Sequence, residues 1–455
     1  MTLRILCGLA LVVLGCDAGR GVAAPPATPS SVVAPPAAAA AAPPPTTAPA
    51  ATPEPTAPTA PRELAPWITA RAIIVDGHVD LPWRLSKGLD AAGRPTEDPS
   101  QRTAAGDFDW ERAREGGLDA PFMSIYVASS FEGKGAKAEA ERLIALVEGL
   151  AAAAPEKFAL ARSPTDVRSN AAMGLVSLPM GMENGAPLEH ELANVKHFRE
   201  RGISYITLTH AKDNHVADSS TDARHTNGGL SAFGKQVVDE MNAVGIMIDV
   251  SHVSDDTFWQ VVERSRVPVI ASHSSCRHFT PGFARNMTDD MIVALAKQGG
   301  VVMINFGSGF LDAEVRRGRE RHEAAVRKLL RKSKLREDDP RAASIRAAYE
   351  AEHPQVRASV EHVADHIEHV IGLVGIDHVG LGSDFDGVGD SLPEGLRDVS
   401  QYPNLVRVLL ERGHDRAAVE KLLGGNLLRV WDAVLRHAQH RPAPRQSPAR
   451  SGPRG

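Results

Sequence analysis

The chain has 455 residues, with 51 Lys and Arg against 56 Asp and Glu, for a net charge of −5. This slightly acidic balance argues against nucleic acid or any other strongly charged partner. Of three cysteines, Cys7 and Cys16 lie in an N-terminal apolar segment, which leaves Cys276 alone in the folded part. No intrachain disulfide is therefore expected after processing.

Residues 1–16 read MTLRILCGLALVVLGC, where Arg4 precedes an apolar run that is too short to span a bilayer. This pattern is typical of an export signal. The segment ends in Leu14-Gly15-Cys16, which resembles the lipobox of bacterial lipoproteins, in which the cysteine becomes the mature N-terminus and carries a lipid. We expect lipidation at Cys16; an ordinary secretory signal with an incidental cysteine is the alternative.

Residues 17–62 are almost entirely Ala, Pro, Thr, Ser and Val and are predicted to form a disordered, semi-extended tether. Residues 437–455 are predicted to be a disordered basic tail, with binding to phosphate or acidic lipid as the alternative. Residues 63–436 then form one domain. The chain is expected in a bacterial cell envelope, lipid-anchored on the periplasmic or extracellular face, with inner versus outer membrane left open.

Eight short apolar runs recur along this domain, and several are followed by stretches with apolar spacing near 3.6. The runs are Ala72–Val75, Phe122–Val127, Gly174–Pro179, Tyr205–Leu208, Ile246–Val250, Val267–Ala271, Gly300–Asn305 and Val379–Gly382. Eight parallel β/α units predict a closed (β/α)8 TIM barrel. A charged stretch from Asp312 to Gln355 is predicted to be a helical excursion on its outside.

Residues suited to metal chemistry follow these strands, whose carboxyl ends converge on one mouth of a parallel barrel. His78 and Asp80 stand two residues apart after the first strand, so both point to the same side and can hold one ion. Glu183, flanked by glycines after the third strand, can bridge two metals. Each motif alone has a structural explanation, and it is their shared position that favours a metal site.

Three successive strands end in histidine, at His210, His252 and His273, and coincidence explains this poorly. The last strand ends in Asp384, a carboxylate that can accept a proton from metal-activated water and pass it to a leaving amine. These positions predict a metallohydrolase site.

Other candidates fit this pattern less well. His362, His366 and His369 share one helix face but precede the last strand, so we expect them at the opposite end of the barrel as surface or packing residues. Cys276 carries no nucleophile motif, and neither a Gly-x-Ser-x-Gly elbow nor a P-loop occurs.

Residues from Ile73 to Val430 resemble the membrane dipeptidases, the renal-dipeptidase type of zinc peptidase. The motifs that carry this resemblance are DGHVDLPW, GMENG, YITLTH, IDVSH, ASHSS, ARNMTDDM, HVGLGSDFDGV, YPNLVRVLL and GGNLLRVW. The resemblance implies two zinc ions with a water or hydroxide between them. His78, Asp80 and Glu183 would hold one zinc, and Glu183, His252 and His273 the other.

The resemblance also assigns roles around the metals. The histidine that matches His210 contacts substrate and stabilises the oxyanion, the arginine that matches Arg285 binds the substrate carboxylate, and the aspartate that matches Asp384 carries the proton. One departure is Val79, where the family usually has asparagine, which puts a hydrogen bond beneath the metals in doubt.

The expected activity is hydrolysis of dipeptides, including those with a C-terminal D-residue, by a protein that resembles commonly dimeric relatives. Two alternatives stay open. The same barrel and metals could act on another amide, lactam, lactone or ester, in which case Arg285 is dispensable. An inactive envelope-anchored binding protein is the other alternative, and the complete ligand set argues against it.

Overall fold

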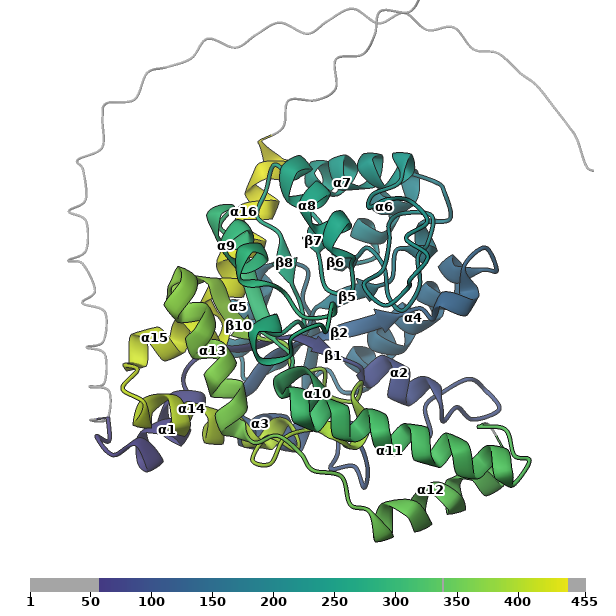
Figure 1. The fold of residues 1–455 in the computed structure, drawn as a ribbon. Helices are drawn as coiled ribbons and strands as arrows, with labels where there is room; N and C mark the ends of the chain where they lie inside the picture. Colours follow the sequence, from purple (N-terminus) through teal and green to yellow (C-terminus); the bar gives the residue numbers. More distant parts are fainter. Residues whose placement is uncertain (1–56, 338, 441–455) are drawn as a thin grey trace, which may run out of the picture. The chain divides into compact units, whose positions relative to one another are not determined.

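The computed structural model describes residues 57–337 and 339–440. Its centre is a closed barrel of eight parallel strands in the order β1-β10-β9-β8-β7-β6-β5-β2 (Figure 1). The barrel strands are β1 (Ile74–Val79), β2 (Leu118–Tyr126), β5 (Met180–Glu183), β6 (Ile203–Thr207), β7 (Met247–Asp249), β8 (Ile270–Ala271), β9 (Val301–Ile304) and β10 (Val379–Leu381). The predicted (β/α)8 fold is confirmed.

One predicted barrel strand was wrong. The run Gly174–Pro179 contains β4 (Val176–Leu178), which pairs with β3 (Phe158–Leu160) in a separate two-stranded sheet. The third barrel strand is instead the next segment, β5. The prediction chose the Val-Ser-Leu run because it is more apolar. The next segment, Met-Gly-Met-Glu, contains a glycine and a carboxylate, which weaken the strand pattern. Glu183 is therefore the last residue of a barrel strand.

Helices surround the barrel and connect its strands. They are α1 (Pro61–Thr69), α2 (Leu81–Ser86), α3 (Trp110–Gly116), α4 (Ala136–Ala153), α5 (Pro164–Ala172), α6 (Ala193–Glu200), α7 (Ala232–Val244), α8 (Asp255–Arg264), α9 (Asp289–Lys297), α10 (Ser308–Leu311), α13 (Val360–Val374), α14 (Tyr402–Glu411), α15 (Arg416–Glu420) and α16 (Asn426–Gln439). Several begin at a side-chain cap: Ser254 and Thr288 accept backbone N–H bonds at the starts of α8 and α9.

The core has two main parts. A large apolar cluster fills the space between the strands and the surrounding helices, and a second joins inward-facing strand residues to α16. In the second, the ring of Phe122 on β2 lies 5.3 Å from that of Trp431 on α16. Strand residues thus bury both faces, as expected for a parallel sheet.

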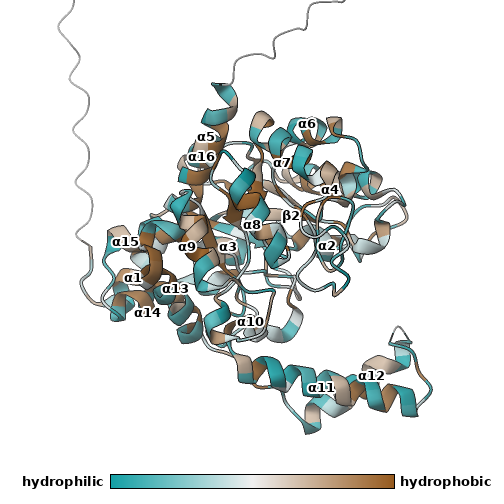
Figure 2. Ribbon diagram, turned by 45° about the horizontal axis from the view of Figure 1, so that its top comes forward, coloured by the Kyte–Doolittle hydropathy of each residue, from teal (hydrophilic) through white to brown (hydrophobic). Residues whose placement is uncertain are grey.

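The charged stretch forms two helices outside the barrel, α11 (Ala313–Lys332) and α12 (Pro340–Glu352). We call this pair the arm; Figures 1 and 2 show it as a hairpin set apart from the barrel. The arm has a small buried core, separate from the two main clusters, formed by Val326, Leu330 and Ala342. The predicted helical excursion is confirmed.

Among the described residues, the first helix begins at Pro61 and the last ends at Gln439, slightly outside the predicted domain limits of 63 and 436. The predicted signal, the lipidation site at Cys16, most of the tether and most of the basic tail lie outside the described residues. Among the described residues, no helix combines the length and apolar character needed to cross a bilayer.

Candidate metal centre

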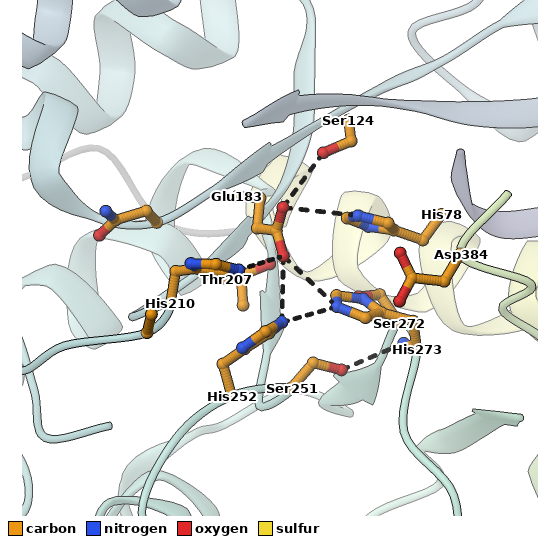
Figure 3. Close-up of polar contacts among 12 residues, drawn as sticks. His78, Ser124, Glu183, Thr207, His210, Ser251, His252, Ser272, His273 and Asp384 are labelled. Atoms are coloured by element: carbon orange, nitrogen blue, oxygen red, sulfur yellow. Dashed lines mark hydrogen bonds and ion pairs between the residues drawn. The ribbon is translucent and has the colours of Figure 1, made fainter. Parts of the chain in front are cut away.

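The residues predicted for metal chemistry converge at the carboxyl ends of the barrel strands (Figure 3). His78 is inside β1, Glu183 ends β5, and the others stand in the loops directly after β1, β6, β7, β8 and β10. The converging residues are His78, Asp80, Glu183, His210, His252, His273 and Asp384.

Glu183 lies at the centre of the group and is only 4% exposed. Its Oε1 is 3.1 Å from His252 Nε2 and 3.4 Å from His273 Nε2. Its Oε2 lies 3.5 Å from His78 Nε2. The two carboxylate oxygens therefore face two different sets of imidazole nitrogens.

Each set is a compact group of metal-ligand atoms. On one side, His78 Nε2 also lies 3.3 Å from Asp80 Oδ2, and this buried nitrogen has no hydrogen-bond partner among the described residues. On the other side, the Nε2 atoms of His252 and His273 are 2.9 Å apart. Nitrogens and carboxylate oxygens at such spacing are the ligands that a divalent ion such as zinc prefers.

The hydrogen bonds of Tyr205 show that His78 carries a proton on Nδ1. The Tyr205 hydroxyl donates its one proton to the Gly77 carbonyl at 3.0 Å and lies 2.9 Å from His78 Nδ1. It therefore accepts from Nδ1–H, which leaves His78 Nε2, facing Asp80 and Glu183, as the nitrogen available to a metal. Tyr205 was not among the predicted site residues.

The hydrogen bonds of Ser272 and Asp249 show in the same way which nitrogen of His273 carries the proton. Ser272 Oγ donates to Asp249 Oδ2 at 2.6 Å and lies 2.7 Å from His273 Nδ1. The hydroxyl must then accept from Nδ1–H, which leaves the lone pair on His273 Nε2. Hydrogen-bond partners of this kind orient metal ligands and raise their basicity.

Two fully buried aspartates hold this end of the barrel together without entering the metal-ligand groups. Asp249 also accepts from Thr207 Oγ1 and from the backbone of Ser251 and Ser272. Asp76 accepts from the backbone of His78 at 2.9 Å and of Ser383 at 3.0 Å, and from the Tyr402 hydroxyl. Sequence reasoning missed both aspartates.

Burial keeps His252 and His273 neutral. Removal from water, followed by the charge of nearby Arg285, lowers the pKa of His252 well below its usual value. Burial likewise lowers the pKa of His273. Neutral imidazoles can ligate metal.

His78 differs from these two histidines. Burial opposes its charged form, but Tyr205 and the carboxylates of Asp80 and Glu183 raise its pKa well above the usual value. The same two carboxylates favour a cation beside His78 Nε2, so the residues on both sides of Glu183 fit bound divalent ions.

Asp384 stands beside this group in a strained backbone conformation. The φ angle of Asp384 is 63°, and that of His252 is 67°. Residues other than glycine seldom adopt such positive φ angles, and those that do are often found at functional sites. Asp384 Oδ2 accepts from Asn305 Nδ2 at 2.7 Å. Burial raises the pKa of Asp384 to about 7, so this carboxyl can both take up and release a proton near neutral pH.

Arg285 is buried next to the histidines. Its guanidinium donates to Ser274 Oγ at 2.7 Å and to the His273 carbonyl at 2.9 Å, while its buried Nε has no partner among the described residues. Burial lowers its pKa to about 10, which leaves it cationic at neutral pH. Arg285 thus supplies a positive charge and an unused donor beside the histidines.

A cavity of about 350 Å³ opens onto the centre. Beside the metal-ligand residues, its walls include Trp83, Tyr126, Phe310 and Val388. His210 forms part of the wall; its ring lies 4.7 Å from that of Tyr126, and its Nε2 lies 3.8 Å from Glu183 Oε1. A small molecule that enters meets aromatic side chains on the outside and the ligand groups at the bottom.

Val79 points away from this cavity. It is fully buried in the apolar cluster between strands and helices, and its backbone bridges to Phe385. Strand alternation places His78 and Asp80 on the opposite side.

The three histidines of α13 stay outside the centre, as predicted, but their expected location at the far end of the barrel was wrong. His366 accepts from the Cys276 backbone at 3.0 Å and lies 2.9 Å from the Leu311 carbonyl, and these segments follow β8 and β9. The preceding helix runs antiparallel to the strand, which brings its first turns to the mouth. His369 pairs with Asp289 at 2.8 Å.

Comparison with known proteins gives a consistent result. The family model described as "Membrane dipeptidase (Peptidase family M19)" matches residues 62–445. Dipeptidase 3 of Rattus norvegicus is 33% identical over 365 residues, which cover 79% of this chain and 65% of the rat protein. The chain thus spans just under two thirds of that relative. An uncharacterized dipeptidase of Schizosaccharomyces pombe is 30% identical, over 84% of this chain and 86% of the yeast protein.

Solved structures share the fold. The probable dipeptidase PvdM of Pseudomonas aeruginosa is 26% identical with a TM-score of 0.71, covering 83% of this chain and 99% of that one. A Rhodobacter sphaeroides metallopeptidase liganded with a phosphinate mimic of L-Ala-D-Ala is 24% identical with a TM-score of 0.64, covering 80% and 99%. The family match across most of the barrel shows that the chain belongs to the membrane dipeptidases, peptidase family M19.

Proposed function

We propose that this protein is a zinc-dependent dipeptidase that binds two zinc ions per chain. The observation that carries the proposal is the position of Glu183, whose two carboxylate oxygens face separate groups of imidazole nitrogens. His78, Asp80 and Glu183 form one binding group, and Glu183, His252 and His273 the other. Zinc bound there polarises a carbonyl and lowers the pKa of the attacking water.

Two residues of the chain, His210 and Asp384, have separate roles toward the substrate in this proposal. His210, on the cavity wall, is placed to donate to the oxyanion that develops on the attacked carbonyl. Asp384, with a pKa of about 7, takes the proton of the attacking water and returns it to the leaving amine.

Arg285 gives the preference for short substrates. A dipeptide has a free carboxylate within one residue of the scissile bond, and the buried Arg285 cation offers a partner for it near His273. A longer chain places an uncharged peptide group there. Acceptance of a C-terminal D-residue is part of the proposal, supported by the L-Ala-D-Ala mimic in the Rhodobacter sphaeroides relative.

We also propose that lipid on Cys16 holds the protein at a bacterial cell envelope and that it forms a homodimer. The lipobox-like Leu14-Gly15-Cys16 supports the first, and the resemblance to commonly dimeric relatives the second. Mass spectrometry of the mature N-terminus and light scattering test these two points.

The metal-loaded protein should hydrolyse L,L and L,D dipeptides, and Arg285→Ala should raise KM more than it lowers kcat. An N-terminally matched dipeptide amide, which lacks the free carboxylate, should be a poor substrate for the wild type and change little with Arg285→Ala. A zinc-loaded protein that leaves every dipeptide intact but cleaves a lactam, another amide or an ester contradicts the proposal.

A further inference from the structure

Charge is unevenly distributed between the arm and the remainder of the chain. Residues 313–353, which include both arm helices, contain twelve Lys and Arg against eight Asp and Glu, whereas the whole chain carries a net charge of −5. The arm is therefore a basic element on an acidic protein.

At the base of the arm these charges are partly neutralised. Arg316 pairs with Glu320 and Arg317 with Glu314, each within α11. His322 lies 3.1 Å from Glu350 on α12. These ion pairs, at helical spacing and between the two helices, offset part of the positive charge at this end of the arm.

The tip of the arm differs. Residues 327–336 contain six Lys and Arg and no acidic residue, and Glu337, Asp338 and Asp339 follow directly in the sequence. All six are exposed. Four of the six form no ion pair with any described residue. We call these four the tip cations; they are Lys328, Arg331, Lys332 and Lys334.

The helix that carries most of these charges packs on α12 through a small core. Val326 and Leu330 of α11 are 1% exposed and pack on Ala342 of α12. Lys328, Arg331 and Lys332 are spaced three and four residues apart, which places them on neighbouring positions of the helix surface. Leu329 is 37% exposed among them. Figure 2 shows this hydrophilic hairpin away from the barrel surface.

Helix stability accounts for only part of this pattern. Cations in the last turn of a helix interact favourably with its dipole, which explains Arg331 and Lys332. It does not explain Lys328, one turn earlier, or Lys334, beyond the helix end.

We infer that the tip of the arm is a docking surface for anionic phospholipid. Clustered Lys and Arg next to an exposed leucine match a surface of negative headgroups over an apolar interior. Each cation near such a surface contributes roughly fivefold to the binding constant, so the four tip cations together contribute on the order of a hundredfold or more. The inference requires neither the proposed activity nor a lipid on Cys16.

Vesicle sedimentation tests this inference with the chain from residue 17 onward, which lacks both the apolar export signal and Cys16, so that neither contributes to binding. The chain should bind vesicles of phosphatidylglycerol with phosphatidylcholine far better than vesicles of phosphatidylcholine alone, and added salt should weaken the binding. Changing all four tip cations to Gln should reduce binding to the anionic vesicles at least about a hundredfold.

A matched variant removes four exposed cations elsewhere and so has the same net charge. Its changes are Lys134→Gln, Lys235→Gln, Arg266→Gln and Lys297→Gln. It should bind anionic vesicles within a fewfold of the parent. Equal loss in both variants would assign the effect to net charge and overturn the inference, as would equal binding to both kinds of vesicle.

A charge-preserving variant separates lipid binding from damage to the arm. Lys328→Arg, Lys332→Arg and Lys334→Arg keep the positive charges, and binding must be retained. If this variant loses binding while its helix content is unchanged, the electrostatic explanation is wrong.

Discussion

The barrel mouth and the arm are built in opposite ways. At the mouth, seven side chains from segments between residues 78 and 384 meet in one buried group. In the arm, the two helices and their small core all come from one continuous stretch of the sequence. The positions of the side chains at the mouth therefore depend on the folding of the whole barrel, whereas the packing of the arm depends mainly on contacts within the arm. Changes in the two regions should have separable consequences.

The largest effect on metal binding should come from Glu183→Gln. Both groups of ligands share this carboxylate, so an amide in its place weakens both at once. We expect bound zinc to fall sharply and hydrolysis to be lost, measured by elemental analysis and dipeptide turnover. Glu191→Gln, at an exposed position nearby, should leave both unchanged. Full zinc content with full activity in Glu183→Gln would contradict the shared-ligand arrangement.

A smaller effect is expected from Ser272→Ala, which removes the hydroxyl between Asp249 and His273. Loss of a hydrogen-bond partner of this kind costs roughly 10- to 100-fold in metal affinity. Competition with a chelator measures the affinity. The exposed Ser169→Ala provides the control. Unchanged affinity in Ser272→Ala would show that the hydroxyl does not position His273.

Gly181→Ala should act on the fold more than on the metals. A Cβ at this position would lie 2.0 Å from the Tyr205 ring, so the ring that orients His78 must shift. Overpacking of this kind costs about 1–3 kcal/mol of unfolding free energy. Gly149→Ala, in α4 with no atom within 4 Å of the new Cβ, should instead stabilise the protein by about 0.5–1 kcal/mol. Denaturant unfolding distinguishes the two, and equal stability of both variants would count against this packing argument.

The smallest effect on the centre is expected from Leu330→Ala in the arm. Leu330 is 1% exposed in the arm's own core, and its truncation should loosen α11 against α12. Faster proteolysis within residues 313–353, with zinc affinity and turnover unchanged, is the expected result. A clear drop in zinc affinity would show that the arm and the mouth are coupled.

Much of the fold was predictable because barrel strands are apolar runs that end in polar residues. The same rule located His78, Glu183, His252 and His273. It misplaced the third strand, because two short strands lie in tandem there and the more apolar one belongs to a different sheet. A single sequence offers no register between strands that would separate the two.

The supporting residues were not predictable for a related reason. Asp249 is the last residue of β7, and a carboxylate in that position was a usable signal, since Asp is rare in buried strands. Its link to His273 runs through Ser272, directly after β8, however, and depends on how β7 and β8 are aligned. Tyr205 reaches His78 across the barrel interior, over 127 residues of sequence.

The pairing of β1 with β10 joins the first and last strands of the barrel. Around that seam, the Asp384 backbone donates to the His78 carbonyl at 3.1 Å, and the Asp80 backbone donates to the Phe385 carbonyl at 2.8 Å. During synthesis, a nascent chain that has not yet reached β10 has no partner for this edge of β1. The growing polypeptide therefore contains the first proposed metal ligands about 300 residues before Asp384, the proposed proton carrier, and all of the proposed site residues are present only when translation is nearly finished.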